Sequence, residues 1–111
     1  MDELIDFLLT TADVAHKQHL ATTSYAQHMA LGEFYAGLRD DSDTLIEALI
    51  GMGNTPTAPE EDISGYLKER YQDLLGMRAL CDGDAAVENL FDGMLARFLS
   101  VIYKLDRFSK P

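Results

Sequence analysis

The first fifty residues carry apolar side chains at spacings of three and four, the period of a helix that packs along one side. The stripe between Asp2 and about Leu20 consists of Ile5, Leu8, Ala12, Ala15 and His19. Residues 22–24, Thr-Thr-Ser, favour N-cap positions over helix interiors. The pattern therefore predicts a first helix to about residue 20, a short turn, and a second helix from about Tyr25.

The second predicted helix is the longest element, with a broad apolar face. Its face consists of Leu31, Phe34, Tyr35, Leu38, Leu45, Ile46 and Leu49. Residues 51–54, Gly-Met-Gly-Asn, then supply the glycine chemistry that commonly ends a helix.

The second half of the chain repeats this organisation after a short linker. Residues 55–60 contain two of the three prolines. Asp62 or Ser64 favours the start of a third helix, which the apolar spacing extends to about Cys81. Asp-Gly-Asp at 82–84 breaks it, and a last helix follows over about 85–108. No alternating strand pattern persists, so we expect an all-α four-helix bundle in a single domain, residues 1–111.

Composition narrows the functional classes. Nine Lys and Arg against nineteen Asp and Glu give a formal charge of −10, which disfavours direct binding to DNA phosphates. The single cysteine, Cys81, allows neither an internal disulfide nor a cysteine cluster for zinc. No apolar run reaches the roughly 20 residues that cross a bilayer, and the acidic start lacks the character of a secretory signal. We therefore expect a cytoplasmic protein without membrane association.

The residues with metal chemistry are three histidines and two acids. His16 and His19 are three apart on the first helix, and His28 follows the predicted turn, so the three rings can meet. Asp43 and Glu47 lie one turn apart on one face of the second helix. Imidazole and carboxylate together suit iron or another divalent metal ion.

One ion cannot contact both groups within one chain. His28 and Asp43 are fifteen residues apart on one predicted helix, which places them roughly 22 Å apart at 1.5 Å per residue. A shared site therefore requires at least a homodimer, with two second helices antiparallel across a two-fold axis.

The stretch HMALGEFYAGLRDDSDTLIEALIGMG, residues 28–53, resembles the second helix of the mini-ferritins that protect DNA during starvation (Dps). His28, Asp43 and Glu47 match the family's ligand spacing, which implies an iron-oxidising site between subunits. For the first-helix ligand, spacing selects His16. The local context, His19-Leu20 where the family usually has His-Trp, selects His19, which we favour.

The resemblance implies a ferritin-like bundle, here shortened because residues 54–61 show no counterpart of the family's short helix between its second and third helices. Residues 19–35 also resemble small proteins of unknown function from tailed phages and marine viruses, which would place the protein in a host cytoplasm.

Two functional hypotheses remain open. The first is a ferritin-like metal binder with ferroxidase activity on ferrous iron. The second is a non-enzymatic, acidic phage accessory protein that binds or inhibits a basic host protein through its helical surface. The chain lacks the paired Glu-x-x-His motifs of diiron bundles, so a diiron site within one chain is not predicted. It also lacks a nucleophile motif, so covalent catalysis is not predicted.

Overall fold

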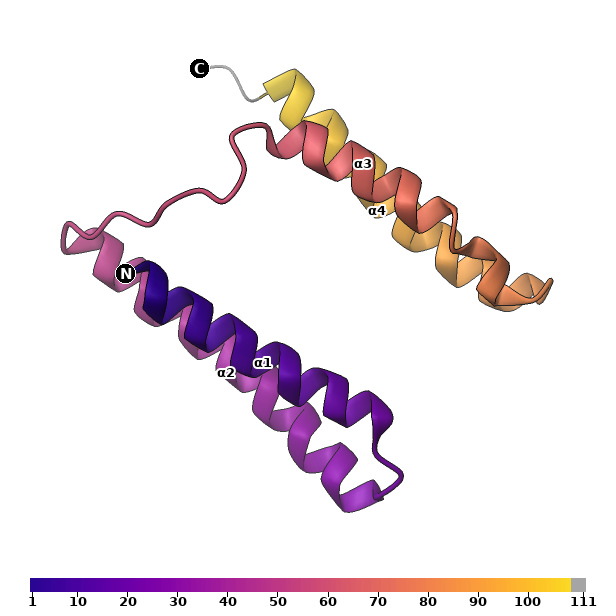
Figure 1. Ribbon diagram of the computed structural model, residues 1–111, viewed down its shortest axis with the longest axis horizontal. Helices are drawn as coiled ribbons and strands as arrows, with labels where there is room; N and C mark the ends of the chain where they lie inside the picture. Colours follow the sequence, from indigo (N-terminus) through magenta and orange to yellow (C-terminus); the bar gives the residue numbers. More distant parts are fainter. Residues whose placement is uncertain (109–111) are drawn as a thin grey trace. The chain divides into compact units, whose positions relative to one another are not determined.

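The computed structural model describes residues 1–108, and these form helices joined by loops (Figure 1). In chain order the elements are α1 (Asp2–Ala21), α2 (Tyr25–Gly51), α3 (Ile63–Leu75), the 3₁₀ helix η1 (Arg78–Cys81) and α4 (Ala85–Phe108). No strand occurs within this range, so the predicted all-α class and its four α-helices are confirmed. None of the helices over residues 1–108 is long and apolar enough to cross a membrane.

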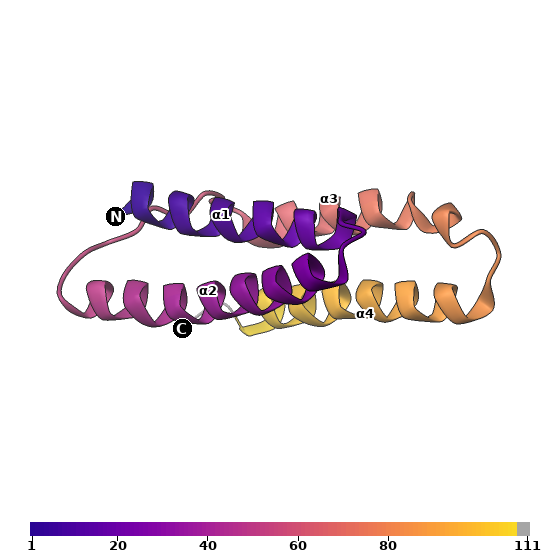
Figure 2. The same cartoon turned by 90° about the horizontal axis from the view of Figure 1, so that it is seen from below.

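The chain divides into two compact units, each built on a pair of helices. The first unit, Met1–Thr57, contains α1 and α2, which pack along their length. The second unit begins at Ala58, and α3 and η1 both pack on α4 within it. In Figures 1 and 2 the two helices of each pair lie side by side and run in opposite directions. The arrangement of all four helices in one domain stays a prediction.

Short polar side chains cap the starts of α2 and α3, as the sequence predicts. The Ser24 hydroxyl accepts a hydrogen bond from the Gln27 N–H at 3.2 Å and caps α2. The Asp62 carboxylate accepts one from the Gly65 N–H at 2.9 Å and caps α3. At the other end of α2, Gly53 adopts a positive φ of 109°, a conformation that glycine reaches without strain.

The third helix is shorter than predicted. We expected it to reach about Cys81, but α3 ends at Leu75 and the chain continues through Gly76 into η1. Glycine lowers helix propensity there, and the Met77 N–H bonds the Leu74 carbonyl at 2.9 Å, three residues back, which tightens the last turn into 3₁₀ geometry.

The buried core of each unit is thin. Its buried apolar residues are Ala12 and Ala15 in the first unit and Cys81, Leu95 and Ile102 in the second. No large side chain in the described residues is fully buried, and Phe7 in α1 remains 67% exposed. Each helix pair therefore buries one narrow seam and leaves large apolar side chains available for further contacts.

Candidate metal centre

The turn between α1 and α2 brings the three histidines to one end of the first unit. His19 lies in the last turn of α1 and His28 in the first turn of α2. Their rings stack with centroids 3.7 Å apart and planes inclined by 19°. The three-residue turn closes this tightly because Ser24 caps α2, while the Thr22 N–H bonds the Gln18 carbonyl at 2.9 Å.

Each ring of this histidine pair, His19 and His28, hydrogen-bonds the backbone of the other residue. His19 Nδ1 lies 2.6 Å from the His28 carbonyl oxygen, and His28 Nδ1 lies 2.9 Å from the His19 carbonyl oxygen. A carbonyl only accepts, so each Nδ1 is the donor and carries a proton. In a neutral ring the lone pair is then on Nε2. This is the tautomer that a histidine needs to bind a metal through Nε2.

Gly32 gives the His19 ring its space. A Cβ at Gly32 would lie 3.0 Å from Cε1 and 3.2 Å from Nδ1 of His19, closer than ordinary van der Waals contact. Gly32 was not among the predicted site residues. The available signal was a glycine inside a long helix, one turn after His28, where it lowers helix propensity.

His16 lies near the histidine pair but has a different partner. Its ring stacks on Tyr35 with centroids 4.0 Å apart and an angle of 10°. The His16 and His19 centroids are 6.2 Å apart, and Tyr35 also meets His19 edge-on at 5.4 Å. Of the two predicted first-helix candidates, the structure therefore brings His19 against His28 and holds His16 against Tyr35, which was not among the predicted site residues.

The histidine pair does not form a metal site by itself. Lone pairs on Nε2 point along the ring planes, and two nearly parallel planes 3.7 Å apart do not converge on one point. Within residues 1–108 no group of three or more His, Cys, Asp or Glu side chains is arranged to hold an ion. Other ligands must therefore complete any site built on these rings.

The predicted acidic ligands lie far along the same helix. α2 is uninterrupted over its 27 residues, which places Asp43 roughly 22 Å and Glu47 roughly 28 Å from His28. Both acids are exposed, and neither makes an ion pair within the part of the chain that the structure describes. The structure thus brings the histidines together and keeps these acids apart from them within one chain.

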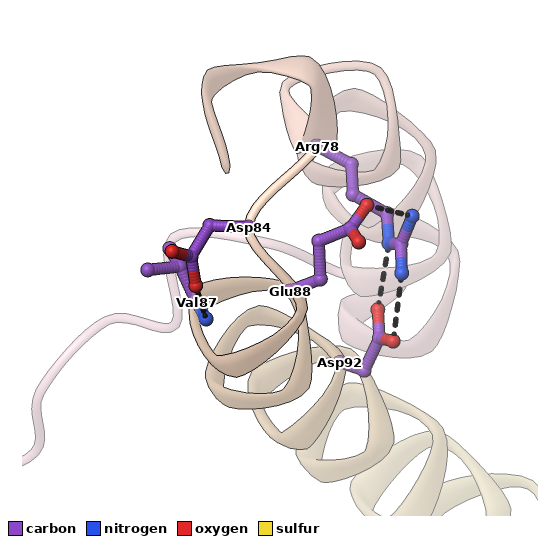
Figure 3. Close-up of polar contacts among 5 residues, drawn as sticks. All are labelled: Arg78, Asp84, Val87, Glu88 and Asp92. Atoms are coloured by element: carbon purple, nitrogen blue, oxygen red, sulfur yellow. Dashed lines mark hydrogen bonds and ion pairs between the residues drawn. The ribbon is translucent and has the colours of Figure 1, made fainter. Parts of the chain in front are cut away.

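A second polar cluster lies in the other unit, around Arg78 (Figure 3). Arg78 bonds Asp92 through Nε at 2.8 Å and Nη2 at 2.9 Å, and Glu88 through Nη1 at 2.9 Å. The hydrogen bonds from Arg78 lower the pKa of Asp92. Asp84, beside this cluster, caps α4 through the Val87 N–H at 3.0 Å. Arg78 engages both carboxylates, so the cluster fastens η1 to α4.

Comparison with known proteins gives one match. The model of a family of unknown function, DUF5856, matches residues 19–105. The matched stretch begins at His19 and contains His28, Asp43 and Glu47. No curated protein and no solved structure matches the chain.

Proposed function

Because the chain belongs to DUF5856, a family of unknown function, its activity must be inferred from its own residues, and we propose that it binds a divalent metal ion at a site shared by two copies. One copy supplies the Nε2 atoms of the histidine pair, which bind separate ions where both are used, and the other copy supplies Asp43 and Glu47. Iron is the leading candidate because of the resemblance to mini-ferritins.

The reciprocal hydrogen bonds of the histidine pair carry this proposal. Both Nδ1 atoms are engaged by backbone carbonyls, so both Nε2 atoms are free to accept a metal. If the two rings served only to fasten the turn, their Nδ1 atoms would suffice and Nε2 could be lost without effect. A metal ligand, in contrast, requires Nε2. That difference can be tested by substitution.

The position of the acids on α2 defines how the second copy would pack. For His28 of one copy to meet Asp43 and Glu47 of the other, two α2 helices must run antiparallel and cross midway between these residues. The midpoint falls at Ala36 and Gly37, which are small and exposed. Small side chains there let two helices approach closely.

The donor set suits a particular range of ions. Imidazole nitrogen with two carboxylates is compatible with ferrous iron, zinc and similar divalent ions. By resemblance, the proposal extends to oxidation of ferrous iron, in which hydrogen peroxide accepts one electron from each of a pair of ferrous ions and is reduced with protons to water.

Anaerobic calorimetric titration with ferrous iron tests the binding. We expect saturable binding to wild type and its loss in both His28→Asn and Asp43→Asn. Asparagine at position 28 can place its amide N–H near the former Nδ1 position and keep the bond to the His19 carbonyl, while it lacks Nε2. The variant therefore separates the ligand from the structural role. Asp41→Asn, an exposed acid on another face of α2, serves as the matched control and should bind as wild type does.

Mixing the two inactive variants tests whether the site is shared. A mixed dimer of His28→Asn and Asp43→Asn chains has one site in which both ligand sets are intact, so binding should partly return. Absence of binding by folded wild type would overturn the proposal, and unaltered binding by Asp43→Asn would overturn the shared site.

A groove in the first unit favours a second candidate function, the non-enzymatic binding of another protein. The groove has a volume of about 810 Å³, and its walls include Phe7, Val14 and Phe34, with Glu3 and Asp6 also lining it. Such a groove suits an amphipathic helix with basic flanks.

Fluorescence tests this second candidate. The chain has no tryptophan, so emission from a tryptophan in a Leu/Lys helical peptide would report binding. Weakening by Phe34→Ala, but not by Leu80→Ala, would support this candidate.

A further inference from the structure

One flank of α2 repeats every seven residues on the exposed surface. This flank consists of Met29, Ala36, Asp43 and Ile50, all of which are exposed. Its apolar members are the kind of residue that two helices bury between them, but a carboxylate interrupts them. The inference drawn from this flank rests on the proposed function, because it concerns what controls the association of the two copies that share the metal site.

Charge is distributed unevenly along α2. The second half of the helix carries Asp40, Asp41, Asp43 and Glu47, whereas the first half carries Glu33 as its single acid. An antiparallel pair places the acidic half of each copy beside the histidine half of the other, while a parallel pair would place acid against acid. The flank therefore fits a second copy of the same chain in the antiparallel direction.

The contact area of this flank is small for a lasting dimer. A helix of 27 residues is about 40 Å long, and a strip about 10 Å wide along it covers roughly 400 Å² per copy. Stable interfaces usually bury about 800 Å² per partner. Each chain also carries a formal charge of −10, which opposes association.

We infer that the metal ion controls this association. Without an ion, nothing compensates the carboxylates of Asp43 and Glu47 for the water that they lose at the contact, and the two acidic chains separate. A bound ion neutralises these carboxylates and ties them to the histidine pair of the second copy. Two-fold symmetry gives two such sites in each dimer, so both ions shift the equilibrium between monomer and dimer.

Sedimentation of the full-length chain, with and without zinc, tests this control. Zinc is the probe because it has no redox chemistry. We expect the mass of a monomer without metal and of a dimer with it. With free zinc at ten times its dissociation constant at both sites, the dimer should become about 100-fold tighter.

Three variants locate the effect. Ala36→Arg places charge in the middle of the flank, away from every ligand, and should prevent dimerisation, while Ala30→Arg on another exposed face of α2 should not. Asp43→Asn combined with Glu47→Gln removes repulsion and ligands together. It should dimerise more readily than wild type without zinc and should no longer respond to zinc.

Other results would overturn the inference in distinguishable ways. A dimer that persists without zinc and still binds it would refute metal control and leave the proposed function intact. Zinc bound by a monomer would refute both the control and the shared site. A folded chain that binds neither zinc nor ferrous iron would refute the proposed function itself.

Discussion

Gly32 determines whether the His19 ring can lie against His28. The ring occupies the space where any larger residue would place its Cβ. Gly37, on the same helix, has open space at the equivalent position, with nothing within 4 Å among the described residues. The two glycines therefore form a natural comparison, because alanine improves helix propensity at both but disturbs a neighbour at one.

We expect Gly37→Ala to raise the free energy of unfolding by up to about 1 kcal/mol, the difference in helix propensity between the two residues. Gly32→Ala should gain less, because the His19 ring must move and its 2.6 Å hydrogen bond must lengthen. Urea unfolding followed by circular dichroism measures both. Equal stabilisation by the two substitutions would show that the ring is not confined.

At the scale of the helices, capping side chains mark where α2 and α3 begin. Asp62→Ala should lower the free energy of unfolding by about 1 kcal/mol, because the Gly65 N–H loses its acceptor. Glu61→Ala, at the exposed residue just before the cap, should have little effect, and thermal unfolding can compare them. A similar loss in both would mean that negative charge, and not the cap, stabilises α3.

The Arg78 cluster makes the second unit sensitive to acid. The pKa of Asp92 lies below its ordinary value of 3.8 because Arg78 donates hydrogen bonds to it. The folded chain therefore holds this proton less readily than the unfolded chain. The stabilisation is complete above the ordinary value and is lost as the pH falls through the lowered one.

Arg78→Met should remove part of this acid sensitivity. Asp92 would then titrate near its ordinary value, so the difference in melting temperature between wild type and variant should shrink below about pH 4. Asp106 in the second unit and Asp2 in the first also contribute acid sensitivity, because hydrogen bonds lower their pKa values. A constant difference across this pH range would contradict the account.

The sequence predicted the helices well because their ends depend on local chemistry. Ser24, one of the three candidates at 22–24, caps α2, and Asp62, predicted with Ser64 as the alternative, caps α3. A capping hydrogen bond spans only three residues, so it can be predicted locally. The predicted end of α3 was wrong. The chain enters η1 instead, and η1 is held by ion pairs from Arg78 to residues across the turn on α4, which local sequence does not reveal. The nearness of His19 and His28 could be predicted, but their reciprocal hydrogen bonds could not, because these depend on the exact closure of the turn and on Gly32.

On the scale of the whole molecule, negative charge and exposed apolar side chains have opposite effects on association between copies. The exposed apolar side chains favour association, and the charge of −10 opposes it. Raising the salt concentration should therefore promote metal-free dimerisation, because the Debye length falls from about 10 Å at 0.1 M to about 3 Å at 1 M. Sedimentation at the two concentrations measures this. Weaker association at high salt would show that ion pairs between copies dominate.

The second unit should be unnecessary for metal binding, since all proposed ligands lie on α1 and α2. Insertion of Gly-Ser-Gly-Ser between Thr57 and Ala58, at the boundary of the two units, should leave the affinity for ferrous iron unchanged. Calorimetry provides the comparison. A marked loss of affinity would show that the second unit takes part in the site.

The stack of Tyr35 on His16 places a natural fluorophore beside the histidine pair. The chain has five tyrosines and no tryptophan, so tyrosine emission is not masked. A paramagnetic ion bound at the pair would quench Tyr35 most strongly, whereas zinc would not quench in this way. Tyr35→Phe would keep an aromatic stack and remove this part of the signal, so the unlabelled protein carries its own optical reporter of site occupancy.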